Sequence, residues 1–269
     1  IIEGITEFLP VSSTGHMILA NEFVNLEPKD FSDTFMVIIQ LGAILAVIAI
    51  YFNRLSPFGK EKLDGGAYPQ KIEQMSGWTK FVNKLYYWFN HNETVELWKK
   101  VIVAVIPAAV LGVLFDDKIE GLLFFPIPVA IALIFYGIVI IFLEERNKSK
   151  ANYKFTDVMQ LSYKTALLIG LFQVLAMWPG TSRSAATIIG GMILGLNRKT
   201  AADFSFFLAI PTMLGATLLK VVKAGAMTGA QWGLIALGFV LSFIVAYVVI
   251  KKFLAYIQKN DFKVFGYYR

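Results

Sequence analysis

The sequence contains no cysteine and only two histidines among its 269 residues. The lack of cysteine excludes disulfides, thiol catalysis and cysteine-ligated metal sites, and two imidazoles argue against a multi-histidine metal centre. Charged residues are scarce as well, at 16% of the chain, whereas hydrophobic residues make up 57%. A typical soluble domain carries about 25% charged residues. This composition, with a mean hydropathy of +0.61, predicts a polytopic integral membrane protein in contact with membrane lipids.

The formal net charge of +6 and the pI near 9.3 would also suit a nucleic-acid-binding protein. Here, however, the lysines and arginines lie between apolar runs, where the positive-inside rule places them in membrane proteins. We therefore predict no nucleic-acid partner. The chain also shows no secretory signal-peptide pattern.

Seven apolar segments predict an all-α fold. Five of them are long enough to cross, or nearly cross, a hydrocarbon core of roughly 30 Å. These five runs lie at 35–52, 101–115, 122–143, 204–222 and 232–249. The other two, 1–23 and 158–196, are interrupted halfway by proline, glycine and hydroxyl residues. Irregular backbone at membrane depth is tolerated only where protein or a polar cavity satisfies it. We therefore expect these two segments to be re-entrant hairpins.

The distribution of basic residues predicts the direction of each segment. The connection 54–100 contains eight lysines and arginines, and 146–164 contains five, so both are predicted to be cytoplasmic. An interfacial amphipathic helix is expected near 78–89 in the first of these connections. By the same count, the hairpins 1–23 and 158–196 enter the membrane from opposite faces.

The two hairpins also resemble each other in sequence. Gly4 and Glu7 of the first correspond to Gly170 and Gln173 of the second, and in both a proline is followed by a cluster of hydroxyl residues. This pattern is typical of inverted-topology repeats whose broken helices meet near the midplane. We predict a single membrane domain, 1–269, that consists of repeat one at 1–143 and repeat two at 158–269.

The first hairpin carries a dense group of polar residues. These are two carboxylates, three hydroxyls and one imidazole: Glu3, Glu7, Ser12, Ser13, Thr14 and His16. Glu3 and Glu7 are four residues apart, so on a helix they share a face and must share a proton or bind a cation. Pro10 ends that helix, and the hydroxyls after it can cap a new one. The N-terminus of the new helix would favour an anion.

The second hairpin contains a corresponding break at Pro179. The polar residues around it are Gln173, Thr181, Ser182, Arg183 and Ser184. The guanidinium of Arg183 matches phosphate or carboxylate geometry. A charge near the bilayer centre costs about 2.5 to 3.5 kcal/mol, so Arg183 needs a partner or a ligand. The alternatives are a structural ion pair of Arg183 with Glu3 or Glu7, a capping role for the hydroxyls, a structural His16, and a hydrogen-bond bridge made by Gln173.

The two breaks combine two helix N-termini, an arginine, hydroxyls, an imidazole and a carboxylate pair. These groups suit phosphoryl transfer, which depends mainly on positioning and charge. A site within the membrane implies a lipid substrate, and each helix end could hold one phosphoryl group of a diphosphate. Paired broken helices also describe ion-coupled carriers, so a transporter or flippase for a lipid phosphate or small anion is the alternative.

Three motifs carry a resemblance to a known family. They are Glu3-x3-Glu7 continuing to Gly15-His16, Pro179-Gly-x-Ser-Arg183-Ser, and the segment from Phe204 to Pro211. With them the chain resembles the undecaprenyl-diphosphatase family, the bacitracin-resistance phosphatases of bacteria. The resemblance implies hydrolysis of undecaprenyl diphosphate to undecaprenyl phosphate and inorganic phosphate, which recycles the carrier lipid of peptidoglycan synthesis.

The resemblance implies further properties. The family acts at the outer face of the bacterial inner (plasma) membrane, uses a divalent cation such as Mg²⁺ or Ca²⁺, contains inverted repeats and forms a homodimer. Its members continue past a pair like Tyr268-Arg269 into another apolar helix, and Ile1 here already lies in an apolar run. We therefore expect the chain to be truncated at both ends.

The resemblance also implies residue roles. Glu3 and Glu7 would bind the cation or act as acid and base, and Arg183 would hold the diphosphate. Either Ser13 or His16 would be the nucleophile, and spacing alone leaves both open. Our hypothesis is attack by Ser13 assisted by His16. The predicted substrate-binding residues are Ser12, Thr14, Gln173, Thr181, Ser182 and Ser184.

Overall fold

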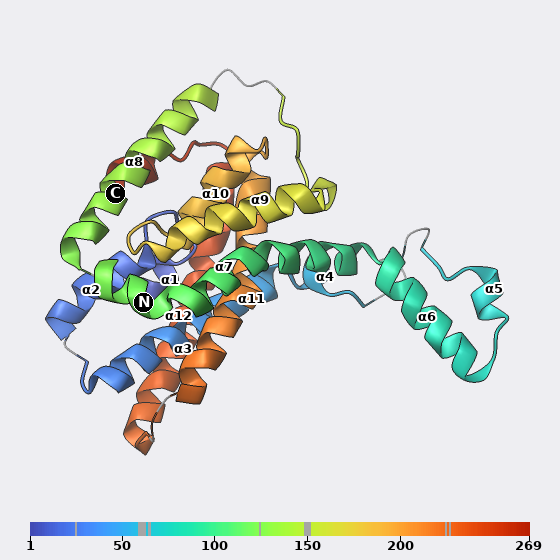
Figure 1. Cartoon of the computed structure of the whole chain (residues 1–269), viewed down its shortest axis with the longest axis horizontal. Coiled ribbons are helices and arrows are strands. Elements are labelled where there is room, and N and C mark those ends of the chain that lie inside the picture. Colours follow the sequence, from blue (N-terminus) through green and yellow to red (C-terminus); the bar gives the residue numbers. More distant parts are fainter. Residues whose placement is uncertain are drawn as a thin grey trace.

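The computed structural model describes residues 1–24, 26–58, 63, 66–123, 125–147, 152–223, 225 and 227–269 (Figure 1). Its helices are α1 (Ile2–Thr6), α2 (Ser13–Val24), α3 (Lys29–Ile50), α4 (Phe52–Leu55), α5 (Gln70–Glu73), α6 (Gly77–His91), α7 (Glu93–Leu123), α8 (Pro126–Asn147), α9 (Tyr163–Val174), α10 (Arg183–Ile193), α11 (Arg198–Lys223), α12 (Gly229–Ile257) and α13 (Lys263–Tyr268). The short 3₁₀ helices are η2 (Val158–Gln160) and η3 (Leu175–Met177). The predicted all-α class is confirmed for this part of the chain.

Five of these helices are long and apolar enough to cross a membrane, namely α3, α7, α8, α11 and α12. They correspond to the five runs predicted from the sequence, but α3, α7 and α11 begin several residues earlier. For α7 and α11, an asparagine ahead of the apolar run caps the helix. The Asn92 side chain accepts a hydrogen bond from Thr94 N at 3.0 Å, and that of Asn197 accepts one from Thr200 N at 2.7 Å. Capping thus adds polar turns that hydropathy alone does not indicate.

Both predicted breaks are present. A turn separates α1 from α2, and η3 with a second turn separates α9 from α10. The residue before each second helix, Ser12 or Ser182, has a φ of 71°. Each of these serines accepts a hydrogen bond at 3.3 Å on its side-chain oxygen, from Gly15 N and Ala185 N respectively. Two breaks far apart in the sequence therefore share one local geometry.

Each hairpin packs closely on a long helix through a glycine. A Cβ added at Gly4 would lie 2.8 Å from the carbonyl oxygen of Ser242 on α12. A Cβ added at Gly170 would lie 2.1 Å from that of Ala104 on α7. Contact this close between two helix backbones is possible only without a side chain. The hairpins are thus held against α12 and α7.

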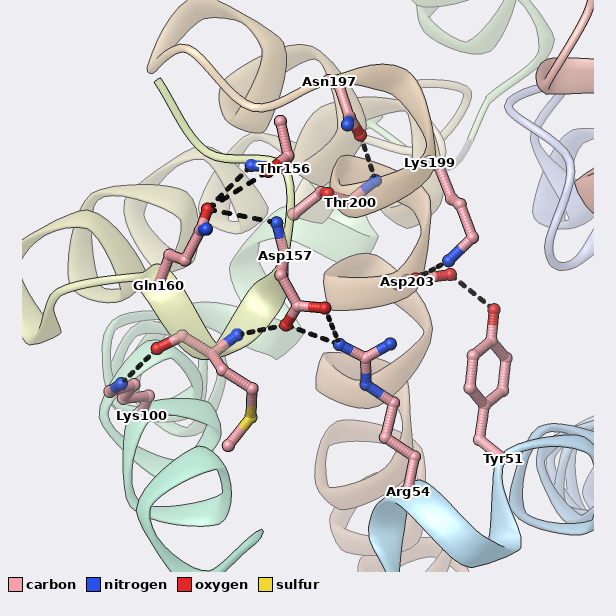
Figure 2. A network of polar contacts seen from close by, with 11 residues as sticks. Tyr51, Arg54, Lys100, Thr156, Asp157, Gln160, Asn197, Lys199, Thr200 and Asp203 are labelled. Atoms are coloured by element: carbon pink, nitrogen blue, oxygen red, sulfur yellow. Dashed lines mark hydrogen bonds and ion pairs between the residues drawn. The ribbon is translucent and has the colours of Figure 1, made fainter. Parts of the chain in front are cut away.

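A polar network joins the end of α3 to α11 and to the segment before α9 (Figure 2). Tyr51 donates a hydrogen bond to Asp203 at 2.5 Å, and Lys199 binds the other oxygen of this buried carboxylate at 2.8 Å. Arg54 Nη2 lies 2.6 and 2.5 Å from the two carboxylate oxygens of Asp157. Burial alone would raise the pKa of Asp157, but the hydrogen bonds from Met159 N–H and Arg54 outweigh burial and hold that pKa below its usual value. Side chains of both halves therefore meet here.

The segment with α5 and α6 lies apart from the other helices, on the right of Figure 1. The sequence predicted a helix near 78–89, and α6 confirms it. Its exposed side chains are mostly aromatic or aliphatic: Trp78, Phe81, Val82, Leu85, Tyr86 and Phe89. At helical spacing these residues form one apolar face. A location at the membrane interface stays a prediction.

Candidate functional site

The two breaks enclose a cavity of about 160 Å³. Residues from both hairpins line it: Glu7, Ser13, Thr14, Pro179, Ser182 and Arg183. The first turns of α2 and α10 both begin beside this space, and the N–H groups of a first turn have no partner within their own helix. The cavity therefore lies between two helix ends that favour negative charge.

Glu7 links the two hairpins through both of its carboxylate oxygens. Oε1 accepts a hydrogen bond from Arg183 Nη2 at 3.1 Å, and Oε2 accepts one from the hydroxyl of Ser13. The side chains of Glu7 and Arg183 are only 7% and 12% exposed, so the ion pair is largely shielded from water. The same carboxylate thus contacts a cation and a hydroxyl inside one cavity.

Arg183 is held at more than one point. Its Nη1 donates a hydrogen bond to the Ser205 carbonyl at 3.0 Å, and the Ser205 hydroxyl accepts one from Thr187 at 2.7 Å. Its Nε is buried and has no hydrogen-bond partner within the part of the chain that the structure describes. A buried N–H donor without a partner is costly. Arg183 itself lines the cavity, so its guanidinium group lies beside the space that a bound anion would occupy.

Glu3 lies next to Glu7 and is 1% exposed. Among the described residues its Oε1 has no hydrogen-bond partner. Two adjacent buried carboxyl groups must share a proton or bind a cation. The described residues contain no group of three or more His, Asp or Glu suited to a metal ion. A divalent cation here would therefore depend on further oxygens, which Mg²⁺ sites commonly take from substrate phosphates and water.

Ser184 and Ser182 connect the breaks rather than only capping α10. The Ser184 hydroxyl donates a hydrogen bond to the Leu9 carbonyl of the first hairpin at 2.9 Å. It also lies 3.0 Å from the Ser182 hydroxyl. Of these two predicted binding residues, Ser182 lines the cavity, whereas the buried Ser184 fixes one hairpin against the other.

His16 contacts groups other than the Ser13 hydroxyl. Its Nδ1 lies 2.8 Å from the Ser12 carbonyl oxygen, and its Nε2 lies 2.7 Å from the Tyr268 hydroxyl. The rings of His16 and Tyr268 stack at 5.6 Å with an interplanar angle of 3°. The side chain bonded to the Ser13 hydroxyl is that of Glu7 and not that of His16.

Gln173 and Thr181 are buried beside the cavity and are absent from its lining. Gln173 Nε2 donates a hydrogen bond to Thr212 at 3.4 Å, which matches the hydrogen-bond bridge considered as an alternative for this residue. The Thr181 carbonyl accepts a hydrogen bond from Arg269 at 2.9 Å. The structure thus gives these two side chains no direct contact with the cavity.

Three residues near the site were missing from the sequence-based set. Gln40 lines the cavity, and a single glutamine inside the apolar run 35–52 was a signal for it. Tyr268 contacts His16, and Arg269 binds backbone carbonyls of both breaks. The sequence offered no comparable signal for these two, because their partners lie far away along the chain.

Another cavity, of about 370 Å³, adjoins the site and is mostly apolar. Glu3 lines it, together with Met17 and Asn21 of α2 and Met36 of α3. Met17 follows Thr14 by one helical turn, and Met36 precedes Gln40 by one, so the same helix faces line both spaces. An apolar space next to a polar one suits a ligand with a charged head and a hydrocarbon chain.

The five long apolar helices and the polar cavity between the two breaks define a multi-pass membrane protein with a polar site at two helix ends. The chain belongs to the family described as bacitracin resistance protein BacA, whose model matches residues 1–269. It is 53% identical over 271 residues to the undecaprenyl-diphosphatase 1 of Clostridioides difficile (strain 630), a match that covers 100% of this chain and 89% of the relative. The undecaprenyl-diphosphatases of Acetivibrio thermocellus and Enterococcus faecalis are 48% and 46% identical, each over 100% of this chain and 90% of the relative.

Proposed function

We propose that this protein hydrolyses undecaprenyl diphosphate to undecaprenyl phosphate and inorganic phosphate, and so recycles the carrier lipid for peptidoglycan synthesis. The observation that carries the proposal is the hydroxyl of Ser13 bonded to Glu7, which in turn is paired with Arg183. A nucleophile, a base and a cation thus share one cavity. The names of the relatives favour this hydrolase over a carrier.

The chemistry begins with Ser13. Its Oγ attacks the terminal phosphorus while Glu7 takes the hydroxyl proton. The bond from that phosphorus to the bridging oxygen breaks, and undecaprenyl phosphate leaves. Glu7 passes its proton to the departing phosphate oxygen. Water then attacks the phosphoserine and loses a proton to Glu7, the bond to Ser13 Oγ breaks, Glu7 returns the proton to that oxygen, and inorganic phosphate is released. His16 acts indirectly, by holding the start of α2 through the Ser12 carbonyl.

Arg183 and the two helix ends offset the charge of the diphosphate. Arg183, which lines the cavity, can bind a phosphate oxygen while its Nη2 still contacts Glu7. N–H groups in the first turns of α2 and α10 favour the negative charge that spreads over the phosphoryl oxygens during transfer. Thr14 and Ser182, which line the cavity, provide further hydrogen bonds.

Glu3 and Glu7 are the residues that would hold a divalent cation such as Mg²⁺ or Ca²⁺, together with substrate oxygens. When bound, the cation would neutralise phosphate charge. The buried Glu3 Oε1, which lacks a hydrogen-bond partner among the described residues, supports this assignment.

The predicted topology is part of the proposal. Each hairpin packs on a long helix of the opposite repeat, Gly4 on α12 and Gly170 on α7, and this reciprocal packing supports a two-fold relation between the repeats. The shared φ at Ser12 and Ser182 supports the same relation. The family resemblance supports a bacterial inner-membrane protein whose cavity opens to the outer face, and it also supports a homodimer.

The test is phosphate release from a detergent-solubilised polyprenyl diphosphate. Ser13→Ala, Glu7→Gln and Arg183→Ala should each lower turnover by about 100-fold or more. Ser242→Ala is the matched control, because Ser242 is another buried serine, on α12, whose hydroxyl has no partner among the described residues. Near-normal turnover in Ser13→Ala or Arg183→Ala would contradict the proposed site.

Trapping the phosphoenzyme identifies the nucleophile. An acid quench preserves a phosphoserine and destroys a phosphohistidine. We expect an acid-stable phosphoryl group that is absent from Ser13→Ala and present in His16→Ala. An acid-labile group lost only in His16→Ala would assign the attack to the imidazole instead.

A further inference from the structure

Arg269 binds the backbone of both breaks at once. Its Nη1 donates a hydrogen bond to the Pro10 carbonyl at 3.0 Å, between α1 and α2. Its Nη2 donates to the carbonyls of Gly180 and Thr181 at 2.5 and 2.9 Å, just before α10. A guanidinium has five N–H donors in a planar fork, which lets one side chain bind two segments in a fixed relation.

The carbonyls that Arg269 binds lie directly beside the proposed catalytic groups. Pro10 precedes the N-cap Ser12 by two residues, and Thr181 precedes the N-cap Ser182 by one. Those two serines immediately precede α2 and α10, whose first residues are Ser13 and Arg183. A shift of either carbonyl would therefore move one of the two helix ends that flank the cavity.

The segment that carries Arg269 is itself anchored. Helix α13 packs on α8 at Gly137, where an added Cβ would lie 2.9 Å from the Gly266 carbonyl oxygen. Arg269 Nε also contacts the Leu133 carbonyl of α8 at 3.4 Å. The neighbouring Tyr268 contacts His16 of α2 at 2.7 Å. The end of the chain, packed on α8, thus contacts α2 through Tyr268, the first break at one carbonyl and the second break at two.

We propose that Arg269 is a positioning residue that sets the distance between the N-termini of α2 and α10. This inference rests on the proposed function, because its consequence is the alignment of Ser13 with a diphosphate held by Arg183. The four hydrogen bonds that the structure gives the guanidinium all end on backbone carbonyls, so its role is to orient the main chain. Misplacing a reacting group by about 1 Å can cost about 100-fold in rate.

The kinetic test compares Arg269→Gln and Arg269→Lys with Arg54→Gln. Arg54 is a matched control, since it is also a partly buried arginine, bonded to the Asp157 carboxylate at 2.6 and 2.5 Å and absent from the cavity lining. Arg269→Gln should lower kcat by about 100-fold with a smaller change in KM, because Arg183 still binds the phosphates. Arg269→Lys should give an intermediate kcat, since an ammonium group lacks the planar fork. Arg54→Gln should lower the thermal midpoint but keep kcat.

A second measurement is independent of activity. Leu19 on α2 and Ile193 on α10 are exposed, and the chain has no cysteine, so Leu19→Cys and Ile193→Cys can carry two spin labels. Adding Arg269→Gln should broaden or shift the distance distribution between the labels, whereas adding Arg54→Gln should leave it unchanged.

The outcomes separate the two proposals. An unchanged distance distribution, or an unchanged kcat in an active protein, overturns the positioning role of Arg269. If the distance changes but the parent protein releases no phosphate from any polyprenyl diphosphate, the positioning role stands and the proposed function fails.

Discussion

Glu7 and Arg183 lie 176 positions apart in the sequence, yet Glu7 Oε1 and Arg183 Nη2 are 3.1 Å apart in the structure. A shielded ion pair is costly to break, because removing one partner leaves the other charge buried without compensation. The pair is therefore also a structural link between the hairpins. The ion pair also lies beside Ser13. In the proposed reaction, an incoming phosphate would replace part of the contact between Glu7 and the Arg183 guanidinium, so a structural and a catalytic role are compatible.

A cation site at the two carboxylates predicts a specific response to chelation. A chelator should lower phosphate release, and added Mg²⁺ or Ca²⁺ should restore it. Glu3→Gln removes one carboxylate charge, so it should raise the cation concentration needed for half-maximal activity. The measurement is a cation titration of both proteins. Full activity in the presence of chelator would contradict the proposed cation site. Glu3 and Glu7 would then share a proton.

The close contact at Gly170 predicts a large effect from one methyl group. Gly170→Ala places a Cβ about 2.1 Å from the Ala104 carbonyl oxygen, so α9 must move away from α7. Overpacking of this kind costs about 1 to 3 kcal/mol. Gly112→Ala in α7 is the control, because an added Cβ there meets nothing within 4 Å. Unfolding in detergent should show loss of stability for Gly170→Ala only, and equal stability of the two variants would refute the contact.

The Arg54–Asp157 contact predicts a pH dependence of stability. Because the folded pKa of Asp157 lies below its usual value, the stabilisation is present above the unfolded pKa of about 3.9 and is lost as pH falls through the folded pKa. Between pH 6 and pH 3 the thermal midpoint should fall less in Asp157→Asn than in the parent protein. Arg54→Gln and the double variant complete a cycle, and additive effects of the two substitutions would show that the pair is not coupled.

The apolar face of α6 predicts contact with the membrane interface, where aromatic side chains are favoured. Leu85 lies on this face and is 51% exposed, whereas the side chain of Asn83 lies on another face of the helix and bonds the Thr79 carbonyl at 2.8 Å. In lipid nanodiscs, a spin label at Leu85→Cys should be accessible to oxygen, which concentrates in the bilayer. A spin label at Asn83→Cys should be accessible to a water-soluble nickel complex. Equal exposure of both labels to the nickel complex would place α6 in water, and a Leu85 label shielded from both reagents would indicate a protein contact.

Much of the site was predictable because its groups are unusual for their surroundings. Carboxylates, hydroxyls and an arginine need a partner when they lie in apolar segments. This requirement identified Glu3, Glu7, Ser13 and Arg183 from the sequence alone. Pairing between them was harder to predict. Our hypothesis from the sequence paired His16 with Ser13, but in the structure the Ser13 hydroxyl contacts Glu7 and His16 contacts Tyr268.

The amino-acid sequence by itself determined the apolar spans, the two helix breaks and the polar groups at each break, because hydropathy, proline geometry and capping act over a few residues. Tertiary structure alone decided which of those groups meet. The contact of Glu7 with Arg183, and the binding of both breaks by Arg269, depend on packing between segments separated by most of the chain. No local sequence pattern predicts such contacts, because they result from the packing of α7, α8 and α12 against the two hairpins.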